Sequence, residues 1–191
     1  MEKLILINSC MRAESRTRRL MEHARKLLAG RYDIEEIDVN AMPLTPVTPA
    51  ILCERNEGYV PENIVETARR IAEADRIVIA APFWDMSIPS VLKVFIENMS
   101  LYNVTFTDNG TTCAGLCKCK RMLYVTTRGM NIPTGSALEQ GSTYLQALSA
   151  LWGCGDVITV SAHNLDYSTP DEIEGKLAEA ERMLCEICQT F

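Results

Sequence analysis

Residues 81–93 read Ala-Pro-Phe-Trp-Asp-Met-Ser-Ile-Pro-Ser-Val-Leu-Lys. An apolar run, Ile77 to Ala81, precedes this stretch and an amphipathic run follows it, which predicts a strand that delivers the chain to a helix. Ligands bind at that edge of an open α/β sheet. Two adjacent aromatic residues and a methionine between prolines at 82 and 89 are bulkier than a minimal turn requires. The stretch therefore predicts one wall of a site for a flat, apolar ligand.

Five apolar runs alternate with five stretches of helical period along the chain, which predicts an α/β fold. The strands are expected near residues 3–8, 32–38, 76–81, 121–127 and 156–162. Four of these runs are almost continuously apolar, as parallel strands covered on both faces are. Residues 32–38 alternate with acidic side chains instead, so this strand is expected at an edge of the sheet.

Helices are expected between these strands. Apolar positions trace a face from Leu20 to Leu28, from Ile64 to Ala72, from Val91 to Met99 and from Tyr144 to Trp152, where Gly153 ends the helix. A last helix begins at Thr169, with a proline at its first position and a glutamate that completes a capping box. The pattern favours a doubly wound sandwich: a five-stranded parallel sheet in the order 2-1-3-4-5, with helices on both faces.

Two long segments, Ala41 to Tyr59 and Asn103 to Lys120, have no place in this scheme and are expected to be loops. Compact domains seldom keep such loops without a use. We therefore expect both of them to wall the ligand site or to form a contact between subunits.

Composition restricts the class of protein. The 191 residues are 47% hydrophobic, which fits a single domain over residues 1–191 with an ample core. The net charge of −6 is spread along the chain, so no basic surface for nucleic acid or for anionic lipid is expected. No apolar run has the length of a membrane span, and the first residues lead directly into a strand without a signal sequence. These features predict a cytoplasmic protein.

Eight cysteines invite a disulfide or metal interpretation. Without a secretion signal we expect thiols. Cys113, Cys117 and Cys119 cluster, but they lack the paired two-residue spacings of zinc and iron–sulfur sites, so no metal is predicted. Cys10 stands close to a helix N-terminus, where the pKa of a thiol falls, although a small packing residue is the better interpretation.

The loop after the first strand carries hydroxyl groups at Ser9, Ser15 and Thr17 and leads directly into a helix. Hydroxyls, free backbone N–H groups and the positive end of a helix together can hold a phosphate. The loop has neither the Gly-x-Gly-x-x-Gly of a dinucleotide cradle nor a P-loop lysine. A helix cap without a ligand is the alternative for Ser15 or Thr17.

Taken together, these residues resemble the FMN-dependent NAD(P)H azoreductases and quinone reductases of flavodoxin-like fold, from Leu4 to about Asp156. Four motifs in the family's order carry the resemblance. They are the Ser9–Thr17 loop; residues 82–93, similar to Pro-Met-Tyr-Asn-Phe followed by Ile-Pro and Leu-Lys; residues 103–120, similar to the segment before the fourth strand; and Thr126-Thr127-Arg128-Gly129-Met130, similar to Thr-Ser-Arg-Gly-Gly.

The resemblance implies hydride transfer from NADH or NADPH through bound FMN to a quinone or azo compound, in a homodimer. The cofactor performs the chemistry, so no catalytic residue is named. The residues that the resemblance assigns to FMN are Ser9, Ser15, Arg16 and Thr17 at the phosphate, Pro82, Phe83, Trp84, Asp85 and Met86 at the ring, and Thr127, Arg128 and Gly129 at the pyrimidine side.

Three positions depart from the family pattern. Asp85 replaces an asparagine, and a carboxylate beside the ring would disfavour an anionic reduced flavin. Met86 replaces a phenylalanine, and Met130 replaces a glycine that accommodates positive φ. Two other classes of protein therefore stay open: a flavodoxin-type electron carrier without catalysis, and a scaffold of the same fold without flavin.

For several residues the sequence also allows an interpretation without a role in ligand binding. Phe83 and Trp84 would also fit plain core packing, and Arg128 would fit a solvated surface charge. His23 is expected at the surface of the first helix, and His163, at the end of the last strand, could approach the site.

Overall fold

The computed structural model describes residues 1–191 and contains a five-stranded parallel sheet in the order β2-β1-β3-β6-β7. The strands are β1 (Glu2–Asn8), β2 (Tyr32–Asp38), β3 (Arg76–Ala80), β6 (Arg121–Thr127) and β7 (Asp156–Ala162). Counted along the sheet alone, this is the predicted order 2-1-3-4-5, and β2 lies at the predicted edge. Both predictions are confirmed.

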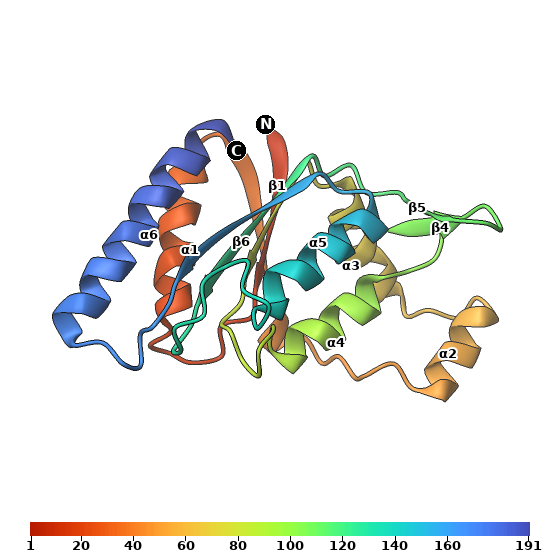
Figure 1. The fold of residues 1–191 in the computed structure, drawn as a ribbon. Helices are drawn as coiled ribbons and strands as arrows, with labels where there is room; N and C mark the ends of the chain where they lie inside the picture. The colour runs from red at the N-terminus through yellow and green to blue at the C-terminus, as the bar shows by residue number, and fades with distance from the viewer.

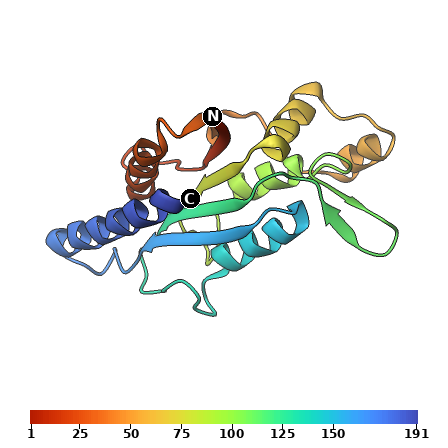
Figure 2. The ribbon, with the colours of Figure 1, turned by 90° about the horizontal axis from the view of Figure 1, so that it is seen from above.

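Helices cover both faces of the sheet. Figure 1 shows α1 (Arg16–Leu28) and α6 (Pro170–Thr190) on one face, with α3 (Glu62–Glu73), α4 (Ser90–Met99) and α5 (Gln140–Trp152) on the other. The view from above shows the same two layers (Figure 2). None of these helices combines the length and the apolar character that a bilayer crossing requires.

The two hydrophobic cores follow from the alternation of side chains along each strand. Leu4 and Leu6 of β1 belong to the core beneath α1 and α6, whereas Ile5 and Ile7 belong to the core beneath α3, α4 and α5. All four side chains are almost completely buried. Strands that bury both faces must be apolar throughout, which is why these runs were visible in the sequence.

The expected helix boundaries have clear local causes. Ser15 caps α1 by accepting a hydrogen bond from the Arg18 amide at 3.2 Å. Gly153 ends α5 in the left-handed region at φ 74°. Thr169 and Glu172 form the predicted capping box of α6, with Pro170 in its first turn.

The expectation of two loops at residues 41–59 and 103–120 is wrong. The first segment holds a short 3-10 helix, η1 (Val39–Ala41), at its start and then α2 (Pro49–Asn56), which Thr48 caps. The second holds an antiparallel ribbon of β4 (Phe106–Asp108) and β5 (Cys113–Gly115). No residue of α2 is buried, so the segment has no apolar face to reveal a helix in the sequence.

Candidate ligand site at the carboxyl edge of the sheet

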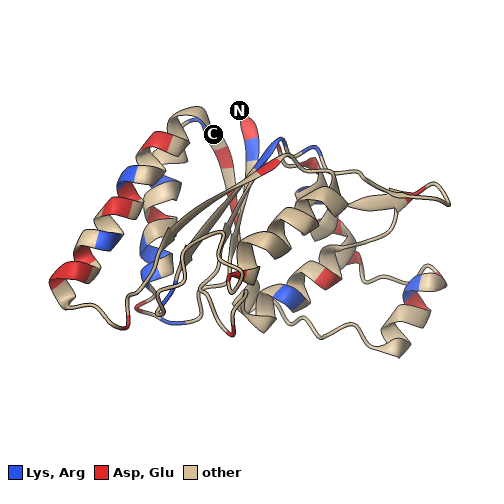
Figure 3. Cartoon of the chain, viewed as in Figure 1, with Lys and Arg blue, Asp and Glu red and all other residues tan.

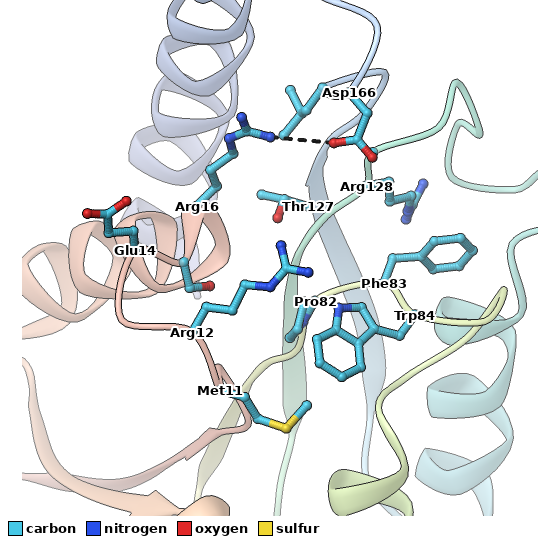
Figure 4. A pocket seen from close by; sticks show the side chains of 13 residues that line it. Met11, Arg12, Glu14, Arg16, Pro82, Phe83, Trp84, Thr127, Arg128 and Asp166 are labelled. Carbon is cyan, nitrogen blue, oxygen red and sulfur yellow. Dashed lines mark ion pairs between the residues drawn. The ribbon is translucent and has the colours of Figure 1, made fainter.

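The largest concentration of predicted site residues surrounds one cavity of about 500 Å³ at the carboxyl edge of the sheet. This volume falls within the roughly 300–1,000 Å³ of small-molecule sites. Loops after β1, β3, β6 and β7 supply its walls, and Figure 4 shows their side chains converging. The lining residues are Met11, Arg12, Glu14, Ser15, Arg16, Pro82, Phe83, Trp84, Thr127, Arg128, Gly129, Leu165 and Asp166. Three segments that the resemblance assigns to FMN therefore meet at one cavity, and a fourth segment, after β7, joins them.

The first wall is the β1–α1 loop and the N-terminus of α1. Ser15 and Arg16 line the cavity there. The backbone N–H groups of Arg16 and Thr17 make no hydrogen bond within the protein, as is usual in the first turn of a helix. The Arg12 guanidinium lies 5.8 Å from the centre of the Trp84 ring and links this wall to the next. The wall presents positive charge and free N–H donors to the cavity.

Ser9 and Thr17 lie behind this wall. Both are completely buried and do not line the cavity. The Ser9 hydroxyl donates to the carbonyl of Ala80 at 2.9 Å, and the Thr17 and Thr127 hydroxyls lie 2.6 Å apart. These bonds tie the β1–α1 loop to β3 and β6, so the two residues support the wall from behind.

The second wall is the segment after β3. The Phe83 amide donates to the Thr127 carbonyl at 3.2 Å, which fixes this segment beside the end of β6. Trp84 and Ser87 exchange two backbone hydrogen bonds and close a tight turn. Asp85 and Met86 form its centre, with φ angles of 46° and 67°. Both side chains are exposed and neither lines the cavity, whereas Pro82, Phe83 and Trp84 do.

The third wall follows β6 and contains a fully buried ion pair. Arg128 and Glu139 are both 0% exposed, and Arg128 Nη2 lies 3.7 Å from Glu139 Oε2. Arg128 also donates to the Ile132 carbonyl at 2.8 Å and to the Thr134 hydroxyl at 3.0 Å. The alternative of a solvated surface charge is thus wrong for Arg128. Burial lowers the pKa of its guanidinium, and Glu139 opposes that shift.

The fourth wall, after β7, was missed in the sequence. A Cβ at Gly129 would fall 1.9 Å from an Asp166 carboxylate oxygen, so only glycine permits this close approach. Asp166 also pairs with Arg16 across the cavity, at 3.8 Å from Nη1 (Figure 4). The expected difficulty at Met130 does not arise, because Met130 has no positive φ.

Three residues singled out in the sequence, Cys10, His23 and His163, lie outside the pocket. Cys10 is buried, and burial raises the pKa of its thiol, which supports packing over reactivity. His23 contacts Cys185 at 3.5 Å. His163 lines a neighbouring cavity with Glu172 and Lys176 and not the main pocket; burial lowers its pKa. Neither of the two long segments lines the main pocket, so the first of the two predictions for them, that they wall it, is wrong. The second, a contact between subunits, stays a prediction.

Comparisons with known proteins agree with this architecture. A family model described as flavodoxin-like fold matches residues 1–186. The chain belongs to the flavodoxin-like fold family. The crystal structure of an azoreductase from Bacillus anthracis str. Sterne superposes on the whole chain with a TM-score of 0.85 and 18% identity, and the match covers 100% of both chains. At this identity the likeness shows the flavodoxin-like fold alone.

Two curated relatives of this flavodoxin-like chain are named FMN-dependent NADH:quinone oxidoreductases. The one from Clostridium acetobutylicum is 33% identical over 117 residues, which are 60% of this chain and 58% of that protein. The one from Clostridium beijerinckii is 32% identical over 137 residues, which are 72% of this chain and 68% of that protein. The chain thus spans less than two thirds of the first relative's length. The family resemblance predicted from the four motifs is confirmed.

Proposed function

We propose that the chain is an FMN-dependent oxidoreductase that passes a hydride from NADH or NADPH, through bound FMN, to a quinone or azo compound. The convergence of the Ser15 loop, residues 82–84 and residues 127–129 on one cavity of about 500 Å³ carries the proposal. The names of the Clostridium relatives, FMN-dependent NADH:quinone oxidoreductases, support this activity. We propose that residues 1–191 form one catalytic domain.

The phosphate of FMN fits the α1 end of the pocket. The Ser15 hydroxyl, the free amides of Arg16 and Thr17 and the Arg16 guanidinium supply hydrogen-bond donors there. The positive end of the helix dipole adds to them. Ser9 and Thr17 hold this loop in place with their buried hydroxyls.

The isoalloxazine ring fits the other end, between Phe83–Trp84 and Thr127–Gly129. The backbone N–H groups of Asp85 and Gly129 have no partner in the protein and are free to donate to the polar edge of a ring. Thr127 and Arg128 complete the pyrimidine side. Met86 shapes this end through its backbone, since its carbonyl accepts from the Gln140 amide at 2.9 Å.

Bound FMN supplies the hydride chemistry, so the protein is required to bind, orient and exclude water. Aromatic side chains exclude water from one end of the pocket, while cations and N–H donors fix the phosphate at the other. The Asp85 carboxylate is exposed and outside the lining, so we expect it to disturb the ring little.

The test is an anaerobic titration. The protein is loaded with FMN, titrated with NADH and separately with NADPH, and then given a panel of quinones and azo dyes. Bleaching by a nucleotide and recovery with an acceptor would support the proposal. FMN-loaded protein that neither nucleotide reduces, with almost no NAD(P)H consumed when a quinone is present, would favour a flavodoxin-type carrier. Protein that stays colourless after FMN is supplied would favour a flavin-free scaffold.

We also propose a homodimer, because a largely apolar groove of about 610 Å³, with Arg55, Lys93 and Glu97 also in its lining, lies between α2, α4 and α5. Leu52, Ile96, Leu148 and Leu151 are among its lining residues. Figure 3 shows no charged residue on α5, whereas α1 and α6 carry many. Sedimentation that finds only monomer at micromolar concentration would overturn this part of the proposal. All eight cysteines are free thiols, which suits a reducing compartment, and we propose the cytoplasm.

A further inference from the structure

The buried partner of Arg128 is not explained by the proposed function. Glu139 is 0% exposed and does not line the pocket, yet its carboxylate lies 3.7 Å from a guanidinium that does. The Arg128 guanidinium in turn lies 5.5 Å from the centre of the Phe83 ring. The charge of Glu139 thus reaches the pocket through Arg128, which it holds against an aromatic wall.

The start of α5, which Glu139 caps, joins two walls of the pocket. Its Oε1 accepts from the Ser142 amide at 2.9 Å, and its Oε2 accepts from the Ser142 hydroxyl. The next residue, Gln140, donates its amide to the Met86 carbonyl at 2.9 Å. The start of α5 is therefore bonded to the turn after β3 and to the segment after β6.

Capping alone does not account for a charged residue at this position. Neutral side chains such as Ser, Thr and Asn cap helices as well as a carboxylate does. A carboxylate without solvent is costly unless a cation compensates it, and Arg128 is the only cation that pairs with Glu139. The negative charge is matched to Arg128, and the pair as a whole is neutral beside the pocket.

We propose that Glu139 is a positioning residue that fixes the Arg128 guanidinium beneath Phe83 and cancels its charge, so that it sets the electrostatic potential of the pocket. Its effect on flavin rests on the proposed function. Its effect on the empty pocket does not. Both can be measured with Glu139→Gln, which keeps an oxygen to accept from the Ser142 amide, while the Ser142 hydroxyl is able to reverse its role and accept.

The first readout needs no cofactor. Trp152 is 0% exposed, so of the two tryptophans only the half-buried Trp84 is open to quenchers, and it lines the pocket. In Glu139→Gln the positive charge of Arg128 is no longer compensated, so it attracts anions to the pocket. In Glu139→Gln, iodide quenching of Trp84 fluorescence should therefore rise by roughly 1.5-fold or more, because an uncompensated positive charge then lies near the indole. Quenching by neutral acrylamide should stay the same. Ionic strength is held at about 0.1 M with chloride, where screening extends over about 10 Å.

The matched control is Glu172→Gln. Glu172 also caps a helix, within the capping box of α6, but it is exposed and has no contact with Arg128. This control should leave the iodide-to-acrylamide ratio at its wild-type value. Glu139→Asp keeps the charge and should restore most of the wild-type ratio. An equal ratio in Glu139→Gln and Glu172→Gln would overturn the proposal, because Glu139 would then be a cap only.

A second pair of variants guards against misfolding of Glu139→Gln. Arg128→Gln removes the positive charge of the pair and should lower the ratio of iodide to acrylamide quenching below its wild-type value. The double variant, Arg128→Gln with Glu139→Gln, should return this ratio to the wild-type value. Circular dichroism identifies folded variants. An iodide ratio in Arg128→Gln that equals or exceeds wild type would also overturn the proposal.

The flavin readout is the reduction potential of FMN-loaded protein. Extra positive charge favours an anionic reduced ring. Glu139→Gln should shift the potential to a more positive value than wild type, and Glu172→Gln should leave it unchanged. A shift of the opposite sign would overturn the role of Glu139 toward flavin. Wild-type protein that binds no FMN would refute the proposed function, and the iodide comparison would still decide whether Glu139 controls the pocket potential.

Discussion

Replacing Gly129 with alanine tests the contact between two walls of the pocket. The new Cβ would fall 1.9 Å from Asp166 Oδ2 and 2.4 Å from its Cγ, whereas ordinary van der Waals contact begins near 3.4 Å. The carboxylate must therefore withdraw. Gly129 does not have a positive φ, so alanine adds no backbone strain there.

The energetic consequence follows from what Asp166 contacts. Its carboxylate is 68% exposed and can turn toward solvent, and the pair that it would lose, with Arg16, is already 3.8 Å long. Pairs of such exposure contribute about 0.2–1 kcal/mol. We expect Gly129→Ala to lower the free energy of unfolding by about that amount, or the Tm by up to about 4 °C. Arg16 would become free, so FMN affinity should rise by no more than about fivefold.

Urea and thermal denaturation measure the stability change, and a fluorescence titration measures FMN affinity. Gly175→Ala is the matched control, because a Cβ there meets nothing within 4 Å and the site lies inside α6. The control should raise stability by about 0.5–1 kcal/mol. A loss above about 3 kcal/mol in Gly129→Ala would mean that Asp166 cannot withdraw, which would refute the reasoning.

Two further substitutions, an alkaline titration and a thiol-labelling experiment also have expected outcomes. Ser15→Ala removes the cap of α1 and should cost about 1 kcal/mol in urea denaturation, while FMN binding weakens more than riboflavin binding; equal weakening would contradict a phosphate role. Met86→Gly relieves a φ of 67° and should stabilise the fold by up to about 1 kcal/mol by the same assay; a loss would show that the Met86 side chain contributes packing. Burial raises the pKa of Tyr124 to about 12, so its phenolate absorbance should appear last on alkaline titration. Because that pKa lies above the unfolded value of about 10, stability should fall as the pH rises from 10 to 12. With a thiol reagent, exposed Cys53 and Cys113 should react in the native protein and buried Cys10 only after unfolding, and early labelling of Cys10 by mass spectrometry would contradict its burial.

The sheet and its main helices could be predicted because burial leaves a clear pattern. Ile77 to Ala81 are apolar throughout, since β3 is covered on both faces. Capping residues such as Thr169 and Gly153 marked helix ends by local chemistry that tertiary contacts do not override. The topology then followed from the handedness of parallel crossovers.

The two segments wrongly predicted to be loops bury few of their residues. In α2 no residue is buried, so its only signal was Thr48-Pro49, a cap followed by a proline. In the β4–β5 ribbon, Asn109-Gly110 was a turn signal within a segment whose strands have only three residues each. Short exposed elements lack the period that sequence reasoning depends on.

The pocket was predicted in part for a similar reason. Hydroxyl and aromatic side chains in the loops that follow strands indicate a ligand site, and on this basis the sequence predicted Ser15, Phe83 and Trp84 at the pocket. Leu165 and Asp166 follow the fifth strand in a loop without a recognisable motif. Their amides donate to the carbonyls of Arg128 and Gly129, and these tertiary hydrogen bonds bring the loop to the cavity. Nor does a sequence distinguish a buried hydroxyl from one that faces a ligand, which is why Ser9 and Thr17 were expected in the lining.

A comparison of FMN with riboflavin is the most direct test of the central claim, that the pocket binds a phosphorylated flavin. Both ligands are titrated into the flavin-free protein, and the quenching of flavin and Trp84 fluorescence is followed. One hydrogen bond to a charged group contributes about 1.5–3 kcal/mol, so we predict one FMN per chain and riboflavin affinity at least about tenfold weaker. Equal affinities, or no binding of either ligand, would contradict the account.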